Sequence, residues 1–234
     1  MDQRKRIDEL VEKLNEASHA YYTHGVEIIT NYEYDEMYDP GYELSAKNMY
    51  EDMCYLHNLG LGGNVSCQVQ RALFPSGAVV NALAKALWDP TKPFDEVEET
   101  YYMDVYGKDG PAVHKYLACI SAMFNLYPHM KEQGHFKALN VSKEEIGKVL
   151  DEFAPTIEAG IQRGGEAKKD WQNLKLHAEY VRKLAKAFEL HDEGKKEEVA
   201  QAAAEVFDYI QENELNLQRV LDVNNTVRVL RGGM

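Results

Sequence analysis

The sequence predicts an all-α protein, with a short N-terminal helical hairpin followed by a larger multi-helix array. Apolar residues recur at three- and four-residue steps through most of the 234 residues, which is the period of an amphipathic helix. Glycine- and proline-rich segments separate these stretches and mark the expected helix ends. Hydrophobic residues make up 44% and charged residues 28% of the chain. This balance is typical of a folded protein and excludes a disordered one.

The first expected elements form the hairpin. A helix is expected over residues 5–22, with one apolar stripe formed by Ile7, Leu10, Val11, Leu14, Ala17 and Tyr21. Asn31 is the expected cap of a second helix, in which Tyr34 and Tyr38 lie four residues apart on one face. Asp39-Pro40-Gly41 is a strong helix breaker, so the first domain is expected to span residues 1–39.

The next region, residues 40–140, is expected to contain four helices. The first runs over 43–59 and ends in a glycine-rich loop, which lacks the Lys-Ser/Thr pair of a phosphate-binding loop. The second is expected from Pro75 to Trp88. Asp95 is the expected cap of the third helix, which ends at Gly107. Gly110-Pro111 is expected to begin the fourth, through Phe124.

The C-terminal region, residues 141–234, is expected to form a helical bundle. Ser142 followed by Glu145 is a capping box, and it predicts a helix that ends before Gly164-Gly165. A clean heptad-like stripe then predicts a core helix through Trp171, Leu174, Ala178, Val181, Ala185 and Phe188. A last long helix is expected through Ile210.

Charge and cysteine content exclude several function classes. The chain has 26 Lys plus Arg against 39 Asp plus Glu, a formal net charge of −13, so direct nucleic-acid binding is not expected. No apolar run approaches the ~20 residues of a membrane span, and no signal peptide is recognised, so a cytoplasmic location is expected. Cys54, Cys67 and Cys119 are too few for a disulfide framework, and no metal site is predicted. The sequence leaves the oligomeric state open.

Three short segments near the N-terminus share one known pattern: Ile7-Asp8-Glu9-Leu10, Ala20-Tyr21-Tyr22 and Asn31–Tyr38. They resemble the N-terminal hairpin of bacterial NAD-dependent DNA ligase, which recognises the nicotinamide mononucleotide half of NAD. The resemblance implies a cofactor site for NMN or NAD formed by Tyr21, Tyr22, Asn31, Tyr34 and Asp35. Asn31 stands where the family usually has Asp, and Thr30 where it has Pro.

A site of this kind is chemically reasonable, since an aromatic face attracts a pyridinium cation and a carboxylate such as that of Asp35 favours its charge. The alternative is that these tyrosines pack against the neighbouring helix. Ligase activity itself is not expected, because adenylation requires a Lys-x-Asp-Gly motif. The nearest match, Lys108-Asp109-Gly110, lacks the spacer residue and is expected to be a turn.

Beyond residue 42 the chain contains Tyr55–Asn64, the run AKALWDP at Ala84–Pro90, and YYMDVYG at Tyr101–Gly107. These segments resemble the C-terminal part of a glycoside-hydrolase-like bacterial family catalogued as domain of unknown function 4838. In that family a barrel bears the candidate catalytic carboxylates and a helical region follows it. The resemblance covers residues 42–127 clearly and 141–234 more weakly.

No catalytic residues are predicted here, because glycoside hydrolysis needs two carboxylates held across a sugar cleft, and most barrel strands are missing. Glu96, Glu98 and Glu99 are expected on a solvated helix face. Trp88, Tyr101, Tyr102 and Tyr106 are expected to be exposed aromatics and are the candidate sugar contacts. The sequence thus favours a non-catalytic helical accessory region with a carbohydrate or protein partner. The alternatives are an NMN-binding module and a helical protein-interaction domain.

Overall fold

The computed structural model describes residues 40–41, 43–59, 71, 73–124, 137–224 and 226–227. The chain divides into two compact units, Met1–Met37 and Tyr38–Met234, and the described residues all belong to the second. In these residues the elements are helices and short 3₁₀ turns, with one isolated bridge and no strand, which confirms the all-α prediction. None of the described helices combines the length and apolar character needed to cross a membrane.

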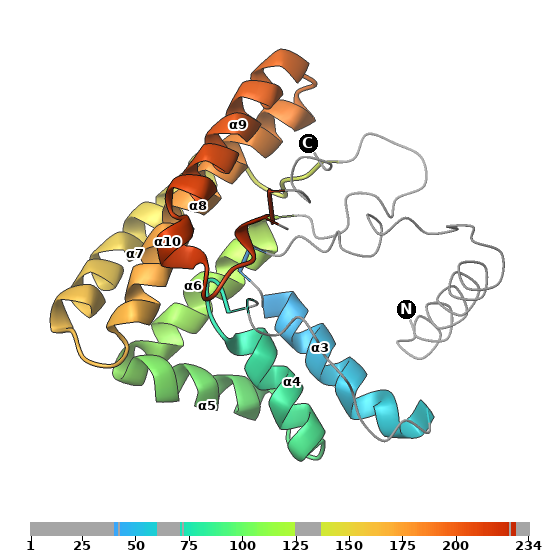
Figure 1. Cartoon of the computed structure of the whole chain (residues 1–234). Coiled ribbons are helices and arrows are strands. Elements are labelled where there is room, and N and C mark those ends of the chain that lie inside the picture. Colours follow the sequence, from blue (N-terminus) through green and yellow to red (C-terminus); the bar gives the residue numbers. More distant parts are fainter. Residues whose placement is uncertain are drawn as a thin grey trace. The chain divides into compact units, whose positions relative to one another are not determined.

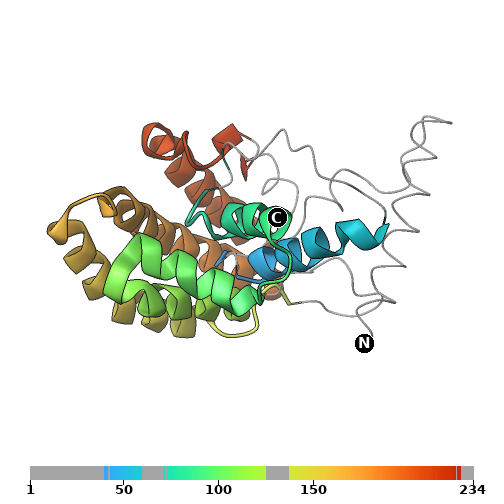
Figure 2. The same ribbon diagram turned by 90° about the horizontal axis from the view of Figure 1, so that it is seen from below.

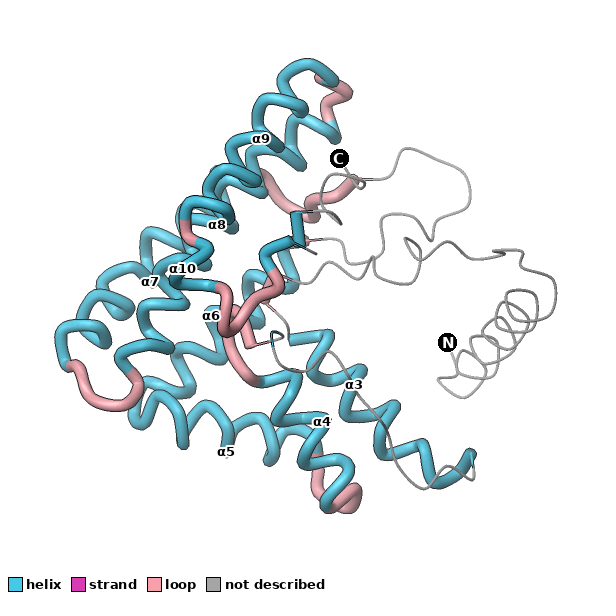
Figure 3. The backbone as a smooth tube through the Cα atoms, viewed as in Figure 1, coloured by secondary structure: helices cyan, strands magenta, loops and turns pink. Residues whose placement is uncertain are grey.

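The helices fall into two halves, which we name the α3–α6 half and the α7–α10 half (Figures 1 and 3). The first half contains α3 (Glu43–Tyr55), the 3₁₀ turn η1 (Leu56–Leu59), α4 (Ala78–Trp88), α5 (Phe94–Tyr106), the 3₁₀ turn η3 (Gly107–Asp109) and α6 (Gly110–Met123). The second half contains α7 (Lys143–Arg163), α8 (Lys168–Asp192), α9 (Lys196–Glu212) and the single turn α10 (Glu214–Leu217).

Packing within each half is mostly between sequence neighbours. In the first half α3 packs on α4, and α5 packs on both α4 and α6. In the second half α8 lies between α7 and α9 (Figure 1). The halves meet where α6 packs against α7, and Figure 2 shows the green helices lying against the yellow and orange ones. Buried residues from both halves form one continuous hydrophobic core.

Several helix ends follow directly from local sequence. The hydroxyl of Ser142 accepts the Glu145 N–H at 3.3 Å, and the Glu145 carboxylate accepts the Ser142 N–H at 3.1 Å, so the predicted capping box is confirmed. Gly107 ends α5 with a φ of 60°, a conformation that favours glycine. The prediction for Asp95 was wrong, since Pro93 is the N-cap residue of α5. Asp95 lies in the first turn, where its charge favours the helix dipole.

The helix α8 is the centre of the second half. Its predicted stripe is buried at Trp171, Leu174, Val181 and Ala185, whereas Ala178 and Phe188 are half-buried. Five further α8 residues are also buried, so the helix is covered on more sides than one stripe requires: Asn173, His177, Tyr180, Leu184 and Ala187. This explains why α8 can pack between two partners.

Two glycines allow backbone approaches that no other residue permits. A Cβ at Gly160 would lie 2.2 Å from the ring of Trp171, so α7 can approach α8 only with glycine at this position. A Cβ at Gly41 would lie 2.0 Å from the carbonyl oxygen of Leu117, so the segment that leads into α3 is seated directly on α6. Both contacts fix how neighbouring helices are placed.

Candidate functional site

Trp88 is the most exposed large hydrophobic residue described, with 89% of its surface accessible. It is the last residue of α4, at the corner that leads into α5. Leu87, its neighbour, is also exposed. Of the four aromatic residues predicted to contact sugar, Trp88 is therefore the one whose ring faces solvent.

The three tyrosines predicted to contact sugar are less exposed than Trp88. Tyr102 and Tyr106 are 1% and 3% exposed and stack on each other in the core, so the expectation that these two rings are exposed was wrong. Tyr101 is half-buried, and its hydroxyl accepts the Gly77 N–H at 2.6 Å. Burial raises the pKa of Tyr101 to about 12, so the hydroxyl stays protonated at neutral pH. Helical spacing explains the difference, since residues 102 and 106 lie on the core face of α5.

The predicted nicotinamide site consists of Tyr21, Tyr22, Asn31, Tyr34 and Asp35, and these residues lie outside the described part of the chain. NMN or NAD binding at this hairpin stays a prediction.

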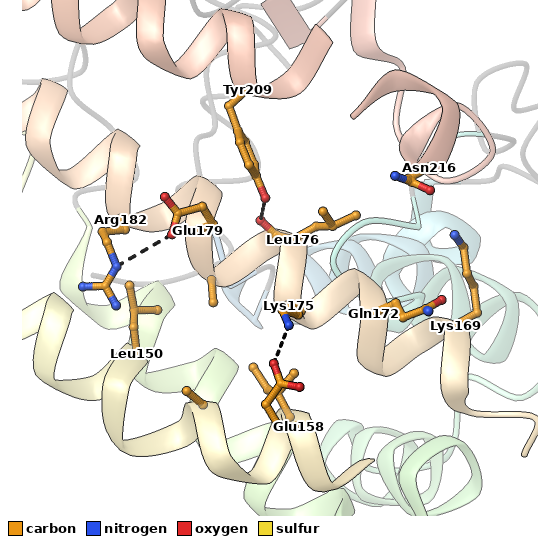
Figure 4. Close-up of a pocket in the computed structure, with 13 residues that line it drawn as sticks. Leu150, Glu158, Lys169, Gln172, Lys175, Leu176, Glu179, Arg182, Tyr209 and Asn216 are labelled. Atoms are coloured by element: carbon orange, nitrogen blue, oxygen red, sulfur yellow. Dashed lines mark hydrogen bonds and ion pairs between the residues drawn. The ribbon is translucent and has the colours of Figure 1, made fainter. Parts of the chain in front are cut away.

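An open groove of about 520 Å³ follows α8 on its surface between α7 and α9–α10 (Figure 4). Its floor is largely aliphatic and is formed by Leu150, Ala154, Ile157, Leu176 and Ala178. Figure 4 shows Tyr209 reaching across from α9, where its hydroxyl donates to the Leu176 carbonyl at 3.1 Å. Burial raises the pKa of Tyr209 to about 12.

Four of the five charged side chains that line this groove form ion pairs. Lys175 lies 2.5 Å from the Glu158 carboxylate, and Arg182 lies 2.6 Å from Asp151 and 4.0 Å from Glu179. These residues are exposed or half-buried, so each pair is worth little in free energy. The groove has the volume of a small-molecule site.

A third feature lies inside the α3–α6 half, and we name it the Glu43–Glu98–His114 cluster. Each residue comes from a different helix: α3, α5 and α6. The His114 Nε2 atom lies 3.1 Å from a Glu43 oxygen and 3.0 Å from a Glu98 oxygen. The ring of Tyr102 stacks on the imidazole at 4.9 Å between centroids and 11° between planes.

Burial and charge act on this cluster together. Hydrogen bonds to Glu43 and Glu98 raise the pKa of His114, while burial raises the pKa of Glu98 above the usual range of a glutamate. Burial also pushes the pKa of Glu43 upward, but its hydrogen bonds outweigh this effect and leave the pKa lowered. The histidine is therefore held as a cation between two carboxyl groups in the absence of any other ligand.

The sequence pattern did not predict this cluster, and the expectation that Glu98 lies on a solvated face was wrong. Glu96 and Glu99 are exposed as expected, but Glu98 is buried. A signal was present: Glu98, Tyr102 and Tyr106 are spaced four residues apart, so they share one face of α5. The spacing alone does not reveal that α3 and α6 supply Glu43 and His114 to that face.

A buried histidine on α8 fixes the chain just before α3. His177 is fully buried, and its Nε2 lies 2.5 Å from the carbonyl oxygen of Pro40, which requires Nε2 to carry the proton. Phe74 and Tyr116 contact the imidazole edge-on. Burial lowers the pKa of His177 to about 4, so the ring is neutral at pH 7.

Comparison with protein-family models gave no match for this chain, and neither did the searches among curated proteins and among solved structures.

Proposed function

We propose that this chain provides a non-catalytic α-helical accessory module to a carbohydrate-active protein, and that it contacts polysaccharide through Trp88. The observation that carries the proposal is the 89% exposure of the Trp88 indole on a helix end. The chain also resembles the helical part of a glycoside-hydrolase-like family through the AKALWDP run, which contains Trp88. This resemblance supports the choice of a carbohydrate ligand.

The physical basis is the nature of an exposed indole. Leaving such a large apolar ring in water forgoes the free energy that its burial would supply, about 25 cal/mol for each Å² of apolar surface. A pyranose ring presents apolar C–H groups on one face and hydroxyls at its edge. An indole face can pack on the first while its N–H donates to the second.

The segment around Trp88 is well anchored, which lowers the entropic cost of binding. Asp89 accepts the N–H of Thr91 at 3.1 Å and its hydroxyl at 2.6 Å. The Tyr50 hydroxyl donates to the carbonyl oxygen of Lys92 at 2.7 Å and so ties this turn to α3. Trp88 thus lies at the end of a helix that leads into a hydrogen-bonded turn.

The proposal is tested by calorimetric titration of the full chain with cellohexaose, xylohexaose and chitohexaose, with tryptophan emission recorded in parallel. Trp88 and the buried Trp171 are the two tryptophans of the chain. Saturable binding of one of these sugars is expected, with a blue shift of the wild-type emission because packing of a sugar removes the indole from water. Trp88→Ala lacks the reporting indole, so its affinity is read from the heat of binding, and we expect a loss of at least about tenfold. Met103→Ala, which removes another exposed hydrophobe, is the matched control and keeps wild-type affinity.

Two results would overturn this function. One is the absence of both binding heat and an emission change with all three hexasaccharides at millimolar concentration. The other is a sugar affinity that is the same in Trp88→Ala, which would move the contact to another surface such as the α8 groove. The first result would leave the exposed indole as a protein-contact residue, since tryptophan is enriched at protein interfaces.

A further inference from the structure

The Glu43–Glu98–His114 cluster has the composition and spacing of a metal site. It offers one imidazole nitrogen and two carboxylate oxygens, which lie within 4.8 Å of one another. Donors at tetrahedral positions about 2.0–2.1 Å from a Zn²⁺ ion stand about 3.3 Å apart. The two distances from His114 Nε2, 3.1 and 3.0 Å, are close to that spacing.

Hydrogen bonding within the cluster leaves part of it unsatisfied. The Nε2 atom of His114 carries a single hydrogen, yet two carboxylate oxygens face it at hydrogen-bond distance. The Glu98 side chain is only 4% exposed, and its second oxygen is buried without a hydrogen-bond partner. The second oxygen of Glu43 is buried without a partner as well. Unpaired buried carboxylate oxygens are costly, and a cation is the ligand that would pair them.

The donors are also held in place before any ion binds. Tyr102 stacks on the His114 ring and fixes its plane. The backbone N–H of Glu43 donates to the Ser121 hydroxyl of α6 at 3.2 Å, and the close packing of Gly41 on Leu117 seats the same segment. Preorganised ligands of this kind bind metal more tightly than ligands on loops that must first be ordered.

We propose that Glu43, Glu98 and His114 bind a divalent transition-metal ion, with Zn²⁺ as the cation that suits this donor set. Mixed nitrogen and oxygen donors favour zinc-like ions, whereas Mg²⁺ and Ca²⁺ prefer oxygen alone. Two carboxylates and a neutral imidazole balance the charge of a dication. His114 and Glu43 are 27% and 20% exposed, so the ion can enter from solvent and keep a water as its fourth ligand.

The bound ion would connect α3, α5 and α6 at one point. This role is independent of sugar binding at Trp88, and each can fail without the other.

The test is calorimetric titration of the chelator-treated full chain with Zn²⁺ at pH 7.5, repeated with Co²⁺ while visible absorption is recorded. One Zn²⁺ per chain is expected, with affinity weakened at least about 100-fold in His114→Gln and in Glu98→Gln, since each removes a direct ligand. His191→Gln is the matched control, because His191 is an exposed histidine that lies 3.4 Å from the carboxylate of Asp192. We expect this variant to bind Zn²⁺ with wild-type affinity.

Failure of the wild-type chain to bind Zn²⁺ at about 100 μM would overturn the proposal, and so would wild-type affinity in His114→Gln. If either variant does not fold, X-ray absorption of the zinc-loaded wild type decides the matter. An imidazole with oxygen ligands at about 2.0–2.2 Å supports the proposal, whereas sulfur at about 2.3 Å assigns the ion to cysteine and overturns it.

Discussion

The two halves of the described unit differ in how deeply their interacting charged side chains are buried. In the α3–α6 half, Glu98 is buried beside His114, and a third ionisable group, Glu43, comes from another helix. In the α7–α10 half, the interhelical pairs lie at the surface: Lys186 contacts Glu205 at 2.8 Å between α8 and α9, and both side chains are well exposed.

This difference indicates which charged residues specify the arrangement of the helices. A surface pair is solvated whether or not it forms, so its net contribution is small. A buried group has no water to replace a lost partner, so its contact specifies one arrangement of helices. We therefore expect charge to specify the first half and apolar packing to supply most of the stability of the second.

The largest expected effect concerns apolar packing in the second half. Trp171→Ala removes a ring that is 1% exposed and packs on Gly160, so unfolding free energy should fall by about 3–5 kcal/mol. Chemical denaturation followed by far-UV circular dichroism measures this change. Trp88→Ala is the control with the same chemistry, and its exposed ring predicts a change within about 0.5 kcal/mol. Equal losses in both variants would contradict the assignment of Trp171 to the core.

The second effect concerns buried charge in the first half. His114→Ala leaves the Glu43 and Glu98 carboxyl groups together without their cation, and we expect a loss of about 3 kcal/mol at pH 7 in metal-free buffer. Adding Glu98→Ala should recover part of this loss, because the buried carboxyl group that has lost its partner is then gone. Strictly additive losses in the double variant would show that the two side chains are not coupled.

The third effect is a pH dependence that arises at the contact between the halves. His177 has a pKa of about 4 in the folded chain, against about 6.5 in the unfolded chain, because burial removes the imidazole from water. Only the unfolded state takes up a proton between these values. The stability that the neutral ring supplies is therefore complete above pH 6.5 and is lost as pH falls toward 4, by about 3 kcal/mol in all.

The matched variant is His177→Gln, which keeps an N–H donor for the Pro40 carbonyl but does not titrate in this range. Denaturation of both proteins between pH 4 and 7.5 isolates the histidine, because other titrating groups are common to the two. The difference in unfolding free energy should change mainly below pH 6.5. A difference that is constant with pH would refute the burial of this imidazole.

Local sequence predicted the described helices well and the cluster poorly, and the reason is physical; the expected hairpin helices of residues 1–39 lie outside the described part of the chain. The Ser142 capping box and the end of α5 at Gly107 depend on groups within four residues, so they are visible in the sequence. The heptad-like stripe of α8 likewise marks one buried face. It does not show that α8 is buried on further sides, which depends on how many helices pack against it.

The cluster depends on residues far apart in the chain. Periodicity places Glu98 on the same face as Tyr102, but its partners Glu43 and His114 come from other helices, and no local pattern connects them. Trp88 was expected to be exposed and is exposed, but periodicity did not separate it from Tyr102 and Tyr106, which are buried. The sites of this chain were therefore less predictable than its helices.

The smallest expected effect concerns the exposed ion pairs of the second half. Glu205→Gln removes the charge that faces Lys186, and since both side chains are exposed, unfolding free energy should fall by less than about 1 kcal/mol. Salt screens exposed charges, so the difference from wild type should shrink further at about 1 M NaCl. The His114→Ala loss should persist in the same salt, because buried charges are screened far less. A fall in unfolding free energy of about 2 kcal/mol or more in Glu205→Gln that does not change with salt would contradict the difference between the halves. It would mean that the packing of α8 on α9 also depends on a specific charge contact.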